Sequence, residues 1–225
     1  MHKVKRNMPP SNLKQKSEKF KKELKKGINI TKDWTNFRKS DIGKQTELHL
    51  KEMYAGCCAY CEGIVGTTGY NQIEHFRPKS KFPELCYEYD NLHLACSKCN
   101  SNKGNKFCED FIDPSVDEPT EHIEYCGWTV RGKDDIGKQM INVTKLNDDD
   151  RIQYRKKCCD EYKKRIETIF NGIKDIEKMT EPIKQLVLES LEDIYRGMKH
   201  GSQYCTMVKE NFKEDLDLIK KMLIS

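Results

Sequence analysis

The sequence has no apolar run close to the ~18–20 residues that a membrane-spanning helix requires. Its first residues, MHKVKRNMPP, also lack the apolar stretch of a signal peptide. There is no Walker motif, no glycine fingerprint for phosphate binding and no repeat period. These absences exclude a membrane span and ATP chemistry carried out by this chain alone, and we expect a soluble, cytoplasmic protein.

Apolar residues are few, at 36% of the chain, whereas charged residues make up 34%. A chain of 225 residues with this balance exposes much solvated helical surface, and its length allows one or two domains. We therefore expect an α+β fold that is mostly helical rather than a β-sandwich.

Cysteine, by contrast, is abundant. Eleven cysteines without an export signal favour metal-binding thiols over disulfides. Two Cys-x-x-Cys pairs, Cys58 with Cys61 and Cys96 with Cys99, have the spacing of two knuckles that together hold one tetrahedral zinc ion. We predict a structural Zn²⁺ site formed by these four thiols.

Two alternatives concern the other cysteines. Cys57 lies directly before Cys58 and is an alternative ligand in the first knuckle. A second metal site near Cys108, His122 and Cys126 is the weaker alternative. For the cysteines outside the two pairs, burial as small apolar side chains is the better interpretation.

The net charge of +5 is mild but unevenly distributed. Residues 1–26 contain ten basic residues and two acidic ones, a local net charge of +8. Such an arm can attract a polyanion by neutralising phosphates and releasing counterions. A solvated tail, or an arm that binds an acidic protein surface, explains the same run of lysines.

Hydrophobic periodicity and turn residues divide the chain into four regions. They are a basic N-terminal arm with helices (1–56), a zinc-pinned β-β-α unit (57–107), a small irregular region with short strands (108–147) and a C-terminal helical region (148–225). Within them we expect helices at 14–26 and 42–55, strands in NQIEHF, DNLHLAC, HIEYCGWTV and QMINVTKL, a short helix in SKCNSNKGNKF, and three antiparallel helices at the end of the chain.

Between the two knuckles lie residues suited to phosphodiester hydrolysis. His75 can act as a base near neutral pH, because imidazole titrates at ~6.5. Glu74 is a hard oxygen ligand for Mg²⁺ or Mn²⁺, and the amide oxygen of Asn100 can supply another. Neighbours on a regular strand point to opposite faces, so Glu74 and His75 share a site only if the strand bends or the metal is reached from its edge.

These residues resemble the motif of the HNH, or ββα-metal, endonuclease superfamily. The matching positions are Cys58 and Cys61, Glu74-His75, Asn91-Leu92, and Cys96 and Cys99 followed by Asn100 and Lys103. The resemblance implies that His75 is the general base and that Glu74 and Asn100 bind a catalytic Mg²⁺ or Mn²⁺. It also implies that Asn91 holds the loop that positions His75.

Simpler roles exist for several of these residues. Asn91 can cap the turn before the second knuckle, and Asn100 can cap the following helix without binding metal. The cations Arg77, Lys79 and Lys103 either bind phosphates of a nucleic acid or are merely solvated.

Other stretches of the sequence resemble one group of proteins within this superfamily. The start KVKRNMPPSNL, the knuckle CAYCEG and the stretch IEHFRPKSKFPEL look like the PtuB-like HNH proteins of Septu-type and retron-associated bacterial defence systems. This implies an antiphage endonuclease, with DNA the favoured substrate, that works with a PtuA-like ABC-type ATPase. The rival hypothesis is a catalytically inert zinc module that binds nucleic acid or a partner protein. A binding module has no use for the pair Glu74-His75, so the enzyme is favoured.

Overall fold

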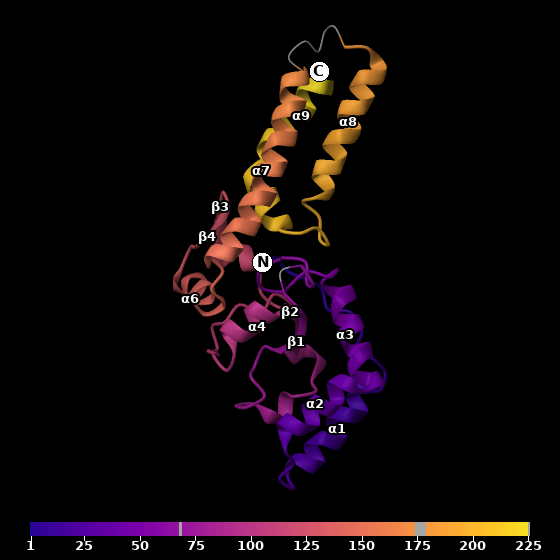
Figure 1. Ribbon diagram of the computed structural model, residues 1–225, viewed down its shortest axis with the longest axis vertical. Helices are drawn as coiled ribbons and strands as arrows, with labels where there is room; N and C mark the ends of the chain where they lie inside the picture. The colour runs from indigo at the N-terminus through magenta and orange to yellow at the C-terminus, as the bar shows by residue number, and fades with distance from the viewer. Residues whose placement is uncertain (68, 174–178, 225) are drawn as a thin grey trace.

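The computed structural model describes residues 1–67, 69–173 and 179–224, which form an elongated molecule of helices and short strands (Figure 1). In chain order the elements are α1 (Leu13–Leu24), α2 (Ile30–Lys39), α3 (Asp41–Met53), β1 (Asn71–His75), η1 (Pro83–Leu85), η2 (Tyr89–Asn91), β2 (Leu92–Cys96), α4 (Ser97–Lys103), α5 (Pro119–His122), β3 (Ile123–Cys126), β4 (Thr129–Gly132), α6 (Asp135–Thr144), α7 (Asp149–Gly172), α8 (Glu181–Arg196) and α9 (Cys205–Ile224). The expected fold class, α+β and mostly helical, is confirmed.

Three helices precede the first knuckle, at the lower end of the molecule in Figure 1. The helices expected at 14–26 and 42–55 are α1 and α3. Helix α2 was not expected from the sequence; it begins where the side chain of Asn29 accepts a hydrogen bond from the backbone N–H of Lys32. As shown below, α2 contributes a side chain to the candidate active site.

The β-β-α unit has the predicted form. Strands β1 and β2 pair antiparallel, from Asn71 opposite Cys96 to His75 opposite Leu92, and α4 follows β2 without a loop. The hairpin lies between two hydrophobic clusters. The N-terminal core includes Trp34, Phe37, Leu50, Ile73, Tyr87, Leu92 and Leu94. The central core includes Cys58, Cys61, Tyr60, Phe76, Ala95, Cys96, Cys99, Met140 and Ile166.

The region after α4 differs in part from expectation. HIEYCGWTV forms the hairpin β3–β4, but the strand expected in QMINVTKL is wrong, because most of this stretch belongs to α6. The side chain of Asp134 caps α6 by accepting a hydrogen bond of 2.8 Å from the N–H of Gly137. Gly137 also allows the helix to approach the backbone of His122, where a Cβ would clash at 2.0 Å.

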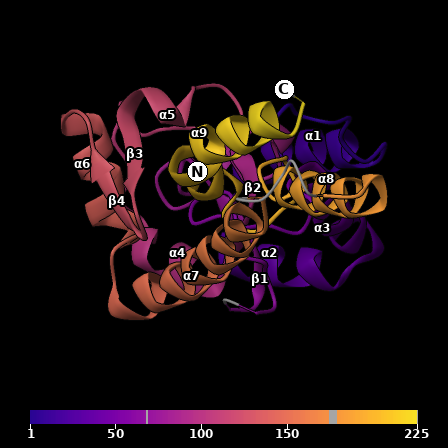
Figure 2. The same ribbon diagram turned by 90° about the horizontal axis from the view of Figure 1, so that it is seen from above.

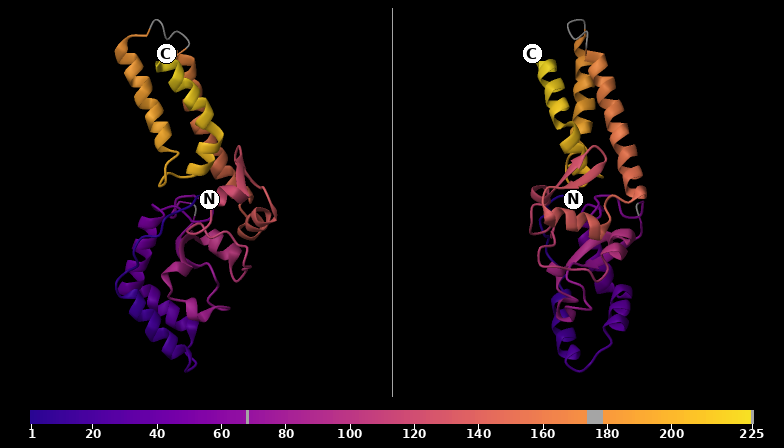
Figure 3. Two further views of the ribbon diagram at one scale, coloured as in Figure 1. Left: turned by 180° about the vertical axis from the view of Figure 1, so that it is seen from behind. Right: turned by 90° about the vertical axis from the view of Figure 1, so that its left-hand side faces the viewer.

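The C-terminal helices α7, α8 and α9 pack against one another and extend away from the β-β-α unit (Figure 3). Seen along the long axis, α6 and the β3–β4 hairpin lie on one side of the molecule, while α1 and α3 lie on the other (Figure 2). In the described part of the chain, no helix combines the length and the apolar character that a membrane crossing requires.

Candidate metal centre and active site

The four cysteines of the predicted zinc site lie close together, next to the first turn of α7. The Sγ atoms of Cys58, Cys61, Cys96 and Cys99 all lie within 4.8 Å of one another and are buried. Sγ of Cys61 lies 3.9 Å from Sγ of Cys96. Tetrahedral bonds of ~2.3 Å would place two sulfur ligands of zinc about 3.8 Å apart, so the cluster has the dimensions of a tetrathiolate site.

The structure decides between the alternatives for the knuckles. Cys58 belongs to the thiol cluster, whereas Cys57 forms a β-bridge with Ile64 outside it. The residues of the alternative second site have other partners: the thiol of Cys108 donates to Gln139, and Nδ1 of His122 lies 2.6 Å from Asp134. Among the described residues they do not form a metal-binding group with Cys126.

Arg151 places a positive charge beside the thiol cluster. The sequence alone did not predict this contact. Its Nη2 atom lies 3.9 Å from Sγ of Cys96, and the side chain is 5% exposed. Burial disfavours the charge of this guanidinium, but the surrounding cysteines outweigh burial and raise the pKa of Arg151. Because Zn²⁺ with four thiolates has a net negative charge, Arg151 would stabilise a state in which zinc is bound.

Glu74 points toward the central core and α4. Its Oε1 atom lies 2.5 Å from Nζ of Lys103, which is fully buried, and accepts a hydrogen bond of 3.4 Å from the hydroxyl of Tyr60. Burial raises the pKa of Glu74, and the neighbouring ammonium group opposes the rise. Lys103 also donates to the backbone oxygen of His75 at 2.9 Å. Contrary to expectation, Lys103 is not placed to bind a phosphate, because its ammonium group is buried and paired inside the protein.

His75 points to the opposite face, toward the N-terminal core, since it is paired with Leu92. Its Nε2 atom lies 3.0 Å from the carbonyl oxygen of Cys86, so Nε2 bears the proton of the neutral ring and donates it. Nδ1 therefore has the basic lone pair. The indole of Trp34 packs edge to face against this imidazole, with 4.3 Å between ring centroids. Burial and the charge of Lys79 lower the pKa of His75 to about 3.

Asn91 holds together the two segments that surround His75. Its side-chain oxygen accepts from the N–H of Arg77 at 2.7 Å, and its amide group donates to the carbonyl oxygens of Arg77 at 3.0 Å and Leu85 at 3.2 Å. The backbone oxygen of Asn91 also accepts from the N–H of Phe76. Asn91 thereby fixes the chain immediately after β1 to the chain before Cys86.

Asn100 is the fourth residue of α4, and its side chain is half-buried. The alternative that it caps this helix is wrong, because the N-cap residue is Cys96, whose sulfur accepts from the N–H of Cys99. Since α4 packs on β1, the structure puts Asn100 on the element that also supplies the partner of Glu74.

Two of the predicted cations remain near the surface around His75. Lys79 lies over the ring of Trp34, 5.9 Å from its centroid. Arg77 pairs with Glu109 at 3.0 Å and covers the rings of Phe82 and Phe107. Of these two charges, that of Lys79 acts on His75.

The comparisons with known proteins agree with this geometry. Residues 58–106 match the family model for HNH endonuclease. These residues form an HNH domain. The match begins at the first zinc-site cysteine and ends shortly after α4, so it includes both knuckles and the β-β-α unit of the HNH domain.

Two curated relatives extend the similarity beyond the HNH domain. The Septu protein PtuB of Bacillus thuringiensis is 38% identical over 111 residues, which cover 48% of this chain and 43% of that protein. The Septu protein PtuB of Bacillus mycoides is 32% identical over 34% of this chain and 37% of that protein. The matched region thus spans less than half the length of each relative.

Proposed function

We propose that the chain is a metal-dependent HNH endonuclease that hydrolyses phosphodiester bonds of nucleic acid, with DNA as the favoured substrate. The observation that carries the proposal is the orientation of His75. Its Nε2 atom is committed to the carbonyl oxygen of Cys86, which fixes the tautomer and leaves Nδ1 as the basic nitrogen. The surface cation Lys79 lies close enough for its charge to act on this ring.

Hydrolysis begins in this proposal with proton transfer to His75. Nδ1 takes a proton from a water molecule, the hydroxide attacks phosphorus, and the bond from phosphorus to the leaving oxygen breaks. The low pKa of His75, about 3, keeps the ring neutral and able to accept a proton at pH 7. A bound phosphodiester, being an anion, would favour the imidazolium and raise this pKa toward neutrality.

Glu74 and Asn100 are the residues that would hold the catalytic cation. Carboxylate and amide oxygens are the donors that Mg²⁺ and Mn²⁺ prefer, and Mg²⁺ commonly uses one or two protein ligands together with water and phosphate oxygens. The donor types therefore fit, although the ammonium of Lys103 already neutralises Glu74 and competes for it. When bound, the cation would stabilise the negative charge that develops on the leaving oxygen.

The opposite directions of Glu74 and His75 are consistent with this division of roles. In an in-line displacement the attacking water and the leaving oxygen are on opposite sides of phosphorus. A base and a metal that act on these two oxygens need not touch each other. They need a phosphate between them, at the end of β1 where His75 is the last strand residue.

The zinc site has a structural role in the proposal. The four thiols connect the knuckle after α3 to the junction of β2 and α4, so zinc would fix the two segments on which the site depends. None of the four cysteines is expected to contact substrate.

The proposed biological setting follows from the relatives, whose names place them in Septu systems. We place this chain as the nuclease of an antiphage, Septu-type or retron-associated complex, with a PtuA-like ABC-type ATPase as its partner. Exposed apolar side chains on the C-terminal helices support a docking role, among them Leu186 on α8 and Leu218 on α9, which are 64% and 54% exposed. Phe170 and Leu218 line a groove of about 250 Å³ on the same part of the molecule.

The test compares binding with cleavage. The purified chain, alone and with the proposed ATPase partner, is incubated with supercoiled plasmid and with structured RNA in Mg²⁺, Mn²⁺ or a chelator. The proposal predicts metal-dependent nicking of plasmid. Binding without cleavage under every condition would instead support the inert zinc module.

A further inference from the structure

A second group of metal-binding side chains lies where the start of the chain, the first knuckle and the C-terminal helices meet. Nδ1 of His2, Oε1 of Glu62 and Sγ of Cys205 all lie within 4.8 Å of one another. His2 Nδ1 is 3.3 Å from Glu62 Oε1 and 3.4 Å from Cys205 Sγ. Neither the sequence pattern nor the proposed nuclease mechanism gives these residues a role.

The separations match ligands of one small cation. Tetrahedral zinc has bonds of ~2.0–2.1 Å to nitrogen and oxygen and ~2.3 Å to sulfur. Two such ligands then lie about 3.3 Å apart if they are nitrogen and oxygen, and about 3.6 Å apart if they are nitrogen and sulfur. The nitrogen–oxygen distance is longer than an ordinary N–H···O hydrogen bond of ~2.9 Å. Imidazole, carboxylate and thiolate are the ligand types that zinc accepts.

The orientation of His2 also suits a metal ligand. Its Nε2 atom lies 2.6 Å from Nδ1 of His200, and the imidazole of His200 is held in turn by the backbone of Met53. If Nε2 of His2 donates to His200, its Nδ1 directs a lone pair at Glu62 and Cys205. A cation or a hydrogen-bond donor would satisfy this lone pair, and a metal ion held by all three side chains is one such cation. A metal-binding histidine usually donates its other N–H to an acceptor in this way.

Glu62 is fixed in place by several contacts. It is 1% exposed and has a φ of +59°, a left-handed conformation that a non-glycine residue adopts only when its surroundings impose it. Its Oε1 atom also contacts the amino group of Met1 at 2.6 Å and the hydroxyl of Thr206 at 2.5 Å, and Oε2 accepts from the N–H of Thr206 at 3.1 Å. Because Met1 and Thr206 are the chain neighbours of His2 and Cys205, these contacts also hold the imidazole and the thiol close to the carboxylate.

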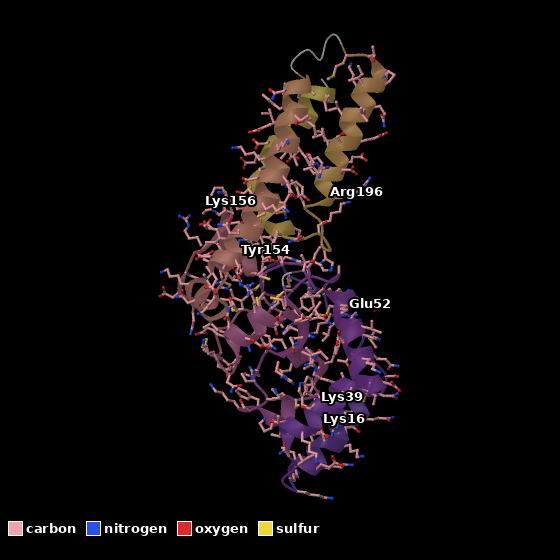
Figure 4. The ribbon with its side chains drawn as sticks, viewed as in Figure 1. Lys16, Lys39, Glu52, Tyr154, Lys156 and Arg196 are labelled. Carbon is pink, nitrogen blue, oxygen red and sulfur yellow. The ribbon has the colours of Figure 1, made fainter. Side chains whose placement is uncertain are left out.

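The exposed side of this group is that of His2 and His200. Glu62 and Cys205 are buried, whereas the side chain of His2 is 18% exposed and His200 is exposed. In Figure 4, Arg196 marks the lower end of α8, from which the loop that contains His200 leads to α9, and Glu52 marks the nearby end of α3.

We infer that His2, Glu62 and Cys205 bind a second Zn²⁺ ion, with the fourth coordination position open to water on the His200 side. Because the three ligands come from the start of the chain, the first knuckle and the first turn of α9, this ion would tie the HNH domain to the C-terminal helices. The inference is independent of nuclease activity, since none of its ligands belongs to the proposed catalytic residues.

The experiment measures metal content in the full-length chain. Protein purified without chelators is analysed for zinc, then titrated with Zn²⁺ and, after metal removal, with Co²⁺. The variants are Cys205→Ser and His2→Gln, and the matched control is Cys126→Ser, which removes an exposed thiol outside both clusters. Circular dichroism checks that each variant is folded.

Two equivalents of zinc in the wild type and in Cys126→Ser, with one equivalent in Cys205→Ser and in His2→Gln, would support the second site. The Co²⁺ form of Cys205→Ser should also lose the charge-transfer absorption of a single thiolate. One equivalent in the wild type, with no second event on titration, would overturn the inference whatever the variants do. Two equivalents in Cys205→Ser and in His2→Gln would also overturn it.

Discussion

Nζ of Lys103 lies 2.5 Å from Oε1 of Glu74, and both side chains are buried at the junction of α4 and β1. The contact neutralises a carboxylate that the HNH motif would assign to a divalent cation. Glu74 therefore has a partner in the absence of metal, and metal binding as proposed would be coupled to this ion pair.

Replacing Lys103 with methionine should destabilise the protein, because a buried carboxylate loses its only positive partner among the contacts described above. We expect a loss of about 3–5 kcal/mol in the free energy of unfolding, measured by urea denaturation. Mn²⁺ should restore more stability to Lys103→Met than it adds to the wild type. The control Lys98→Met, at a side chain that is 48% exposed on the same helix, should change stability little. Equal effects of the two substitutions would refute the coupling.

Arg151→Met should weaken zinc retention without removing a ligand, because the thiol cluster loses its adjacent positive charge. We expect zinc to be lost to a chelator about 10–100 times faster than from the wild type. Arg165→Met, an exposed substitution on the same helix, is the matched control. Unchanged release of zinc from Arg151→Met would show that the guanidinium does not stabilise the cluster.

His75 should make stability depend on pH in a defined direction. Its pKa is about 3 in the folded chain against an ordinary value of 6.5, so between these values the unfolded chain binds a proton that the folded chain does not. Its contribution is fully present above pH 6.5 and is lost as pH falls toward 3. Urea unfolding at pH 7.5 and pH 5 should show a larger drop for the wild type than for His75→Gln. The same drop in both proteins would contradict the assigned pKa.

Docking by the C-terminal helices predicts that Leu186→Asp and Leu218→Asp reduce association with the proposed ATPase partner in a pull-down. Leu48→Asp is the matched control, because Leu48 is 55% exposed but lies on α3. If only Leu48→Asp weakens the complex, the partner binds the N-terminal helices instead.

Much of the HNH domain was predictable because its signals are local in sequence. Two residues between the members of each Cys-x-x-Cys pair define the knuckles, and apolar residues at the alternate positions Leu92 and Leu94 indicate β2. The prediction of a strand in QMINVTKL was wrong. Ile141, Val143 and Thr144 favour strands, but the cap at Asp134 and tertiary packing stabilise a helix.

The site residues that the sequence did not predict contact residues far away in the chain. Trp34 reaches His75 from α2, and Arg151 reaches Cys96 from α7. His2 and Cys205 are 203 positions apart in the chain. Charge and hydrophobic pattern show that such residues exist, but only the packing of distant elements shows what they contact.

The most direct test of the account is the initial rate at which supercoiled plasmid is cleaved in Mn²⁺ by the wild type, His75→Ala and the control His49→Ala. All three proteins are purified in the same way and assayed side by side. The proposed ATPase partner is added to each if the wild type requires it. The account predicts that His75→Ala is slower by ~10²–10⁴-fold while retaining zinc and fold, and that His49→Ala matches the wild type. A folded His75→Ala protein that cleaves at the wild-type rate would contradict the account.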